Sequence, residues 1–68
     1  KGISQRESEI IKLLALGSTN KQIADQLGLS HHTVHTHRRN IMKKLNIRTI
    51  SELTLFAVKT RLIESTNY

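Results

Sequence analysis

The sequence predicts an all-α domain of four short helices. Three expected helix starts carry Ser or Thr followed three residues later by Glu or Gln, which is the capping-box pattern. These pairs are Ser4 with Glu7, Thr19 with Gln22, and Thr49 with Glu52. Behind each start, Ile, Leu and Val recur at the three- and four-residue spacing of a helix. The 68 residues include no Pro to interrupt such helices, and a chain of this length makes one small domain, residues 1–68.

The first expected helix begins after Ser4 and ends at Leu16, with Gly17 as its C-terminal cap. Apolar residues at helical spacing form its core-facing stripe. These are Ile10, Leu13 and Leu14, with Ile11 on the flank. We interpret this helix as scaffold.

Residues Asn20 to Leu45 have the pattern of a helix-turn-helix. Ala24 is small enough for close crossing of two helices, and Gly28 can adopt the positive φ that ends a helix. Thr19 is the expected N-cap of the helix before the turn, and Ser30 of the helix after it. The apolar positions that turn both helices toward one core are Ile23, Leu27, Leu29 and Val34. In the DNA-binding form of this motif, the second helix enters the major groove.

The start of the helix before the turn is a candidate phosphate site. Asn20 and Lys21 lie in its first turn, where unpaired N–H groups and the helix dipole favour an anion. These residues could equally serve only to begin the helix, and the sequence leaves both interpretations open.

The helix after the turn, expected from His31 to Leu45, has two unlike sides. Val34, Ile41 and Leu45 form its buried stripe. The opposite side has no apolar residue and consists of His32, His35, Thr36, Arg39 and Lys43. This pattern predicts a recognition helix whose outer side meets base edges and phosphates.

Individual roles on this helix follow from side-chain chemistry. Arg39 is the best candidate for a bidentate contact to guanine, and His35 and Thr36 are short enough to reach base edges. Lys43 and Lys44 lie a turn or more later, where the helix leaves the groove and meets the backbone. At the edges of the buried stripe, we interpret His37 as a packed scaffold residue, and Arg38 as a side chain that can extend to a phosphate.

Charge and composition restrict the class of protein. The net charge is +6, and no acidic residue lies between Asp25 and Glu52, an interval that holds five basic residues and all four His. Such a run can be an ordinary solvated helix face, but its place on a helix-turn-helix favours a phosphate-binding surface. The chain has no Cys, no apolar run near the roughly 18 residues of a membrane span, and no signal-peptide pattern.

A metal site and an enzymatic function are not expected. His31 and His35 have a spacing that can chelate zinc, but no Cys or carboxylate lies nearby to complete four ligands. We therefore predict no metal and no other cofactor. No nucleophile with a supporting base and acid is apparent either.

The last expected helix follows Thr49 and carries two apolar stripes. One consists of Ile50, Leu53 and Ala57 with Phe56 at its edge, and the other of Leu55, Val58 and Leu62. A terminal helix on so small a domain has one core to face, so the second stripe suggests a partner, most simply a second copy. The alternative is that a missing part of a longer chain covers it, and the sequence does not decide which stripe faces inward. Ser65 to Tyr68 are expected to form a frayed tail.

Taken together, these residues resemble the DNA-binding domain of LuxR/NarL-type bacterial transcription regulators. The resemblance is carried by Ser4-x-Arg6-Glu7-x-Glu9-Ile10, Leu13-Leu14-Ala15-x-Gly17, Thr19-Asn20-Lys21-Gln22-Ile23-Ala24, Leu29-Ser30-x-x-Thr33-Val34-x-x-His37, Asn40-Ile41-x-x-Lys44-Leu45 and Glu52. It extends from Ile3 to about Ile63. It implies a four-helix domain whose third helix reads the major groove and whose fourth often mediates dimerisation.

The resemblance also implies roles for individual positions. Base-reading positions fall on His35, Thr36 and Arg39, and backbone-contacting positions on Thr19, Asn20, Lys21, Thr33 and Lys44. To these we add His32, Arg38 and Lys43 as backbone contacts, and Leu55, Val58 and Leu62 as the dimer interface. Two positions depart from the family pattern, because members commonly have Lys where His35 stands and often a basic residue where Ile50 stands.

We interpret the chain as a sequence-specific domain for double-stranded DNA, the C-terminal output module of a longer cytoplasmic regulator, since it begins without Met. It would bind as a homodimer to half-sites about one helical turn (~10 bp) apart, with RNA polymerase as a further potential partner and no membrane. One alternative is a promoter reader of the sigma-factor type within RNA polymerase. Another is a protein-interaction module that has lost DNA affinity, against which the acid-free outer side argues.

Overall fold

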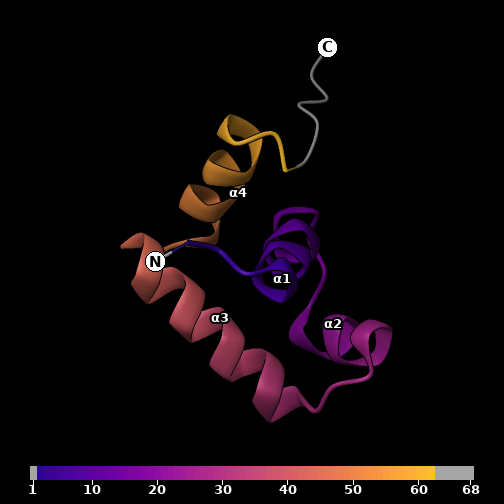
Figure 1. The fold of residues 1–68 in the computed structure, drawn as a ribbon. Coiled ribbons are helices and arrows are strands. Elements are labelled where there is room, and N and C mark those ends of the chain that lie inside the picture. Colours follow the sequence, from indigo (N-terminus) through magenta and orange to yellow (C-terminus); the bar gives the residue numbers. More distant parts are fainter. Residues whose placement is uncertain (1, 63–68) are drawn as a thin grey trace.

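The computed structural model describes residues 2–62 and places four α-helices in that range (Figure 1). They are α1 (Gln5–Ala15), α2 (Asn20–Leu27), α3 (His31–Leu45) and α4 (Ile50–Lys59). The all-α class, the helix-turn-helix and all four helix starts predicted from sequence are confirmed. The tail expected from Ser65 to Tyr68 lies outside the described residues. No helix among residues 2–62 is long and apolar enough to cross a membrane.

The capping boxes at α1, α2 and α4 form as the sequence predicts. At α1, the Ser4 hydroxyl accepts from the Glu7 N–H at 3.1 Å, and Glu7 Oε1 accepts from the Ser4 N–H at 2.9 Å. Gly28 ends α2 with a φ of 69°, the left-handed conformation that the turn requires. Local side-chain chemistry therefore fixes where these helices begin and where the turn occurs.

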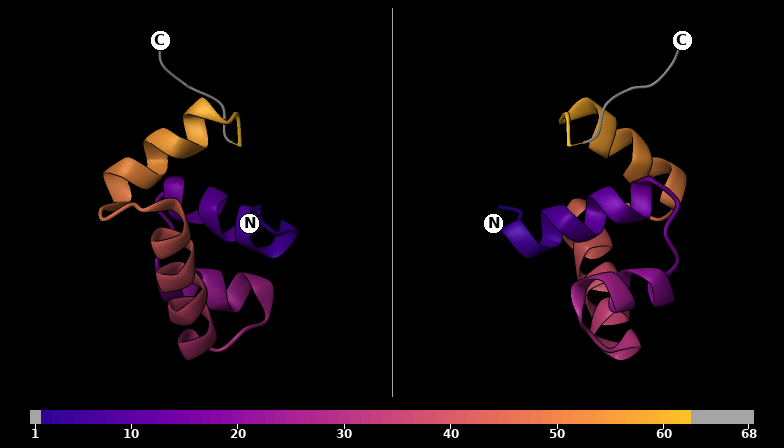
Figure 2. Two further views of the ribbon diagram at one scale, coloured as in Figure 1. Left: turned by 60° about the vertical axis from the view of Figure 1, so that its left-hand side comes forward. Right: turned by 90° about the vertical axis from the view of Figure 1, so that its right-hand side faces the viewer.

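α1 occupies the centre of the fold. It contacts each of the other three helices, while α2 packs on α3. In Figure 1, α3 lies along one side of the molecule, with α2 near its N-terminal end and α4 near its C-terminal end, and Figure 2 shows α4 at the same end of α3 in both views. This arrangement leaves one long side of α3 uncovered by the other helices.

Nine apolar side chains among residues 2–62 form the core between the helices. They are Ile10, Ile11, Leu14, Ile23, Ala24, Val34, Ile41, Leu53 and Ala57. Two expectations for α1 are corrected: Ile11 is fully buried and does not lie on the flank, and Leu13 is only partly buried. The physical reason is that α1 packs on three helices and so buries a wider arc than one stripe. Leu45, expected in the buried stripe of α3, is likewise only partly buried.

The structure decides which stripe of α4 faces inward. Leu53 and Ala57 are fully buried, whereas Leu55 is 55% exposed. The placement of Leu62 on the outer helical stripe is wrong, because α4 ends at Lys59 and the chain then turns. The Leu62 N–H donates to the carbonyl of Ala57 at 2.8 Å, and its side chain packs against the core.

Candidate nucleic-acid interface

The uncovered side of α3 presents the residues that the sequence predicts there. His32, His35, Arg39 and Lys43 are exposed, and Thr36 is partly buried. We call these five residues the outer face of α3. These residues face away from the core because Val34 and Ile41, on the opposite side of the helix, are fully buried. Since α3 contains no carboxylate, its outer face offers cations and neutral hydrogen-bonding groups.

Thr33 lies at the start of α3 with its hydroxyl already oriented. The Ser30 hydroxyl accepts from the Thr33 N–H at 3.0 Å and donates to Thr33 Oγ1 at 2.9 Å. Because Thr33 Oγ1 is the acceptor in this bond, the Thr33 hydroxyl proton is not used in it and can be donated to another acceptor, such as a phosphate oxygen.

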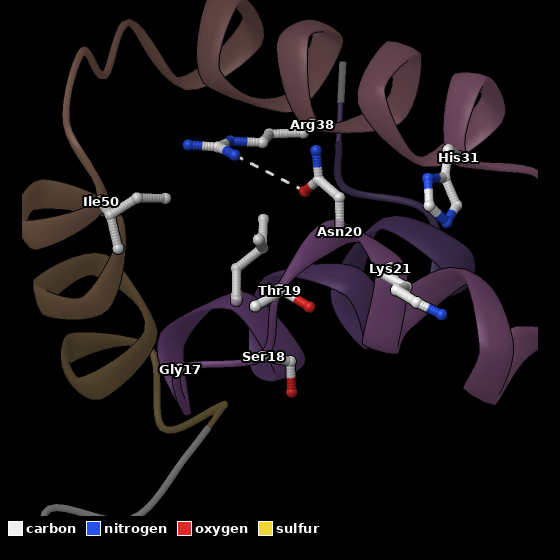
Figure 3. A pocket seen from close by; sticks show the side chains of 9 residues that line it. Gly17, Ser18, Thr19, Asn20, Lys21, His31, Arg38 and Ile50 are labelled. Carbon is white, nitrogen blue, oxygen red and sulfur yellow. Dashed lines mark hydrogen bonds between the residues drawn. The ribbon is translucent and has the colours of Figure 1, made fainter.

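One flank of α3 faces the first turn of α2 across an open hollow of about 510 Å³ (Figure 3). Thr19, Asn20 and Lys21 line it from α2, and His31 and Arg38 line it from α3. Leu14 and Ile50 add apolar surface. The hollow thus combines a helix N-terminus with the Arg38 side chain, both of which favour an anion, while the Lys21 ammonium group points away toward Asp25.

The cations that line this hollow have only weak partners among residues 2–62. Arg38 Nη1 donates to Asn20 Oδ1 at 3.5 Å, a long hydrogen bond to a neutral amide. Lys21 Nζ lies 3.9 Å from Asp25 Oδ2, and both side chains are more than two-thirds exposed, at 71% and 72%. An exposed ion pair at this distance contributes little. Both cations can therefore turn to a phosphate at low energetic cost.

The other flank of α3 faces α1 and is closed by an ion pair. Lys44 Nζ donates to Glu7 Oε1 at 2.9 Å, to Glu7 Oε2 at 3.1 Å and to the Gly2 carbonyl at 3.2 Å. The Glu7 side chain is 13% exposed and that of Lys44 is 35% exposed. The Ser4 N–H, and next to it Lys44, lower the pKa of Glu7, so this carboxylate stays charged. Lys44 thus has a partner inside the domain, and a phosphate contact would require it to leave Glu7.

Sequence reasoning missed both of these contacts between helices. Asn20 and Arg38 are 18 positions apart, and Glu7 and Lys44 are 37 positions apart, so no helical spacing joins them. For Glu7 in particular, the sequence predicts only a capping role. The available signal was that the helices carry opposite charges. This signal does not indicate which acidic residue pairs with which basic residue.

Two large apolar side chains among the described residues are prominently exposed. Leu55 projects from α4, and Leu16, 69% exposed, lies at the C-terminal end of α1. Val58, predicted to share an interface with Leu55, is partly buried. Within residues 2–62 there is no cluster of three or more His, Cys, Asp or Glu that could hold a metal ion.

Comparison of the sequence with known proteins gives consistent matches. Residues 1–57 match the model of the luxR family of bacterial regulatory proteins, GerE. The chain is 53% identical over 57 residues to the uncharacterized response regulatory protein YgeK of Escherichia coli K12, covering 84% of this chain and 39% of YgeK. It is 44% identical over 62 residues to the oxygen regulatory protein NreC of Staphylococcus carnosus, covering 91% of this chain and 29% of NreC.

A solved structure has the same fold. The response regulator ChrA of a heme-sensing two-component system superimposes with a TM-score of 0.82 at 36% sequence identity. The match covers 93% of this chain and 31% of ChrA. The chain therefore spans less than two-fifths of the length of each of these relatives.

Proposed function

The chain belongs to the luxR family of bacterial regulatory proteins, a family of DNA-binding transcription regulators, and from this we propose that it reads a specific duplex sequence with α3 in the major groove. The observation that carries the proposal is the outer face of α3. Four of its five residues are exposed, it has no carboxylate, and the hollow at α2 borders it. An α-helix with such a face fits the width of the major groove.

The flank beside α2 would hold the DNA backbone. A phosphate seated at the first turn of α2 could accept from N–H groups there and from Asn20, Lys21 and Arg38. Thr19 borders the same hollow, and Thr33 offers its hydroxyl proton at the start of α3. His32 and Lys43 would meet phosphates at either end of the outer face. These contacts fix orientation and carry no sequence information.

Base reading would come from the middle of the outer face. Arg39 is exposed and has no ion-pair partner among residues 2–62, so its guanidinium can form the bidentate contact to guanine O6 and N7. His35 and Thr36 lie within one turn of Arg39 and would contact neighbouring bases. The hydrogen-bond pattern of these three side chains would set the preferred sequence.

Pairing would use the outer side of α4. Leu55 is the exposed apolar residue there, and Val58 lies three positions on along the same helix. A second copy on this surface would bury Leu55 and place two α3 helices on half-sites about one helical turn (~10 bp) apart. We assign the interface to Leu55 and Val58, with Leu62 displaced toward the core. The proposal also locates the protein in the cytoplasm, with DNA and RNA polymerase as partners of the full-length regulator.

The proposal is tested by selecting bound duplexes from a random DNA pool and following the affinity of the selected sequences between 50 and 200 mM salt. A consensus of two half-sites with a steep salt dependence is expected. Salt-sensitive binding without any consensus would remove base reading. A single site without symmetry would favour a promoter reader, and an absence of binding would favour a protein-interaction module.

Pairing is tested separately by Leu55→Asp. Because Leu55 is exposed, the variant should fold with a free energy of unfolding changed by less than about 1 kcal/mol. It should nevertheless lose cooperative binding to a two-half-site duplex, measured by band shift. Leu16→Asp is the matched control, since it places the same charge on another exposed leucine, at the C-terminal cap of α1 and outside α4. Equal losses in both variants would contradict the interface.

A further inference from the structure

All four histidines of the chain lie on α3, at positions 31, 32, 35 and 37. His31, His32 and His35 are exposed, whereas His37 is partly buried. His35 follows His31 by four positions and His32 by three, so the three exposed imidazoles are neighbours on the helix surface. Figure 3 shows His31 extending from α3 toward the first turn of α2.

The charged groups around these imidazoles are mostly cationic. On α3 itself they are Arg38, Arg39 and Lys43, and across the hollow from His31 lies Lys21 of α2. Asp25, also on α2, is within ion-pair distance of Lys21. No ion pair or side-chain hydrogen bond among residues 2–62 involves a histidine.

The carboxylates of the other helices packed near α3 also have partners of their own. On α1, Glu7 pairs with Lys44, and Glu9 lies 3.6 Å from Arg6. Glu52 of α4 accepts from the backbone N–H groups of Arg48 and Thr49. Within residues 2–62, the exposed imidazoles therefore gain no compensating negative charge from contacts with other residues.

We propose that His31, His32 and His35 are proton-dependent DNA contacts, so that the domain takes up protons when it binds a duplex. The inference rests on the proposed function and adds His31 to the contact surface. Without DNA, no carboxylate among residues 2–62 forms an ion pair with these imidazoles. Beside the phosphate backbone, the surrounding potential becomes negative and favours the charged imidazolium form.

The direction of the pH dependence follows from the difference between the surroundings of the imidazoles with and without DNA. Imidazole changes charge between about pH 5 and 8, and DNA favours its protonated form over the form in free protein. The added affinity is therefore fully present at the acidic end of this range and is lost as the pH rises. His37 is excluded, because it is partly buried at the edge of the stripe that faces the core.

The experiment measures affinity for one mixed-sequence duplex of about two helical turns, with the 68-residue chain at pH 8 and pH 5.5. We expect about tenfold tighter binding at pH 5.5, and a salt slope that is steeper by about 0.9 for each imidazolium that meets a phosphate. The triple variant H31Q/H32Q/H35Q should lose both effects, so that its affinity and its salt slope are the same at pH 5.5 as at pH 8. His37→Gln is the control and should keep both effects.

Circular dichroism at each pH confirms that every variant is folded. Equal affinity and equal salt slope of the unchanged chain at the two pH values would overturn the inference, and this comparison needs no variant. A pH dependence that survives in the folded triple variant would overturn it as well. Either result would leave duplex binding intact, whereas an absence of binding at both pH values would overturn the proposed function too.

Discussion

The two flanks of α3 each carry a basic side chain, but in different surroundings. On the α2 flank, the one hydrogen-bond partner of Arg38 within residues 2–62 is the neutral amide of Asn20 at 3.5 Å, beside an open hollow. On the α1 flank, Lys44 contacts both carboxylate oxygens of Glu7, at 2.9 and 3.1 Å. One cation is available to an external anion, and the other already has an internal anion.

The difference shows that charge counted along a sequence is not the charge presented to a ligand. Both cations belong to the acid-free interval between Asp25 and Glu52, and the net charge of +6 counts them equally. Since Glu7 neutralises Lys44, the positive surface is displaced toward the α2 flank and the outer face. We therefore expect the DNA backbone to be held mainly on the α2 side of α3.

The largest effect on DNA affinity is expected from a substitution on the outer face of α3, and it should differ in kind from the effect of a substitution on either flank. Arg39→Ala removes the proposed bidentate contact to guanine, so binding to the selected operator should weaken by about 1–3 kcal/mol. Repeating the pool selection with this variant should show relaxed preference at one base-pair position in each half-site. Arg38→Gln is the comparison variant, because loss of a phosphate contact should weaken all sequences alike.

If Arg39→Ala instead weakened binding to every duplex equally, Arg39 would belong with the backbone contacts. An unchanged operator affinity would remove the recognition assignment altogether. Either result would contradict the assignment of base reading to the outer face and backbone contacts to the flanks.

Local patterns predicted most of the fold. The three capping boxes, Gly28 in the turn and the buried Val34 and Ile41 depend on residues a few positions apart, so their signals are readable in sequence. The burial of Ile11 was not predictable in this way, because it depends on how many helices surround α1. The same holds for Leu62, whose position follows from where α4 ends.

The candidate interface was also predictable only where it depends on residues close together in the sequence. Sequence indicated which residues share the outer face of α3, since helical periodicity alone determines that. It did not indicate which cations are free, because the pairing of Glu7 with Lys44 depends on how α1 crosses α3. The contact between Arg38 and Asn20 likewise depends on how α2 packs on α3.

A smaller effect tests the two flanks directly. Arg38→Gln should lower the salt slope of duplex binding by about 0.9, because one phosphate contact is lost. Lys44→Gln should change the slope by much less, since Lys44 remains with Glu7. The measurement is affinity for one mixed-sequence duplex between 50 and 200 mM salt. Equal decreases in the two variants would show that Lys44 leaves Glu7 on binding, as its predicted backbone contact requires.

The smallest effect is on the stability of the domain without DNA, and it concerns the ion pair between Glu7 and Lys44 on the α1 flank. The pKa of Glu7 is lowered, first by the Ser4 N–H and then by Lys44. A carboxylate with a lower pKa in the folded than in the unfolded state stabilises the fold above its unfolded pKa. That stability is lost as the pH falls through the lowered folded value. Glu7→Gln keeps an acceptor for the capping box but removes the charge.

We therefore expect Glu7→Gln to cost less than about 1 kcal/mol at neutral pH, because the Lys44 side chain is partly exposed. The difference in urea midpoint between the two proteins should shrink as the pH falls below the ordinary range of a Glu carboxyl. Glu52, whose pKa is lowered by the backbone N–H groups of Arg48 and Thr49, is present in both proteins and cancels in this comparison. A constant difference down to the most acidic pH would mean that neither the Ser4 N–H nor Lys44 favours the charged form of Glu7.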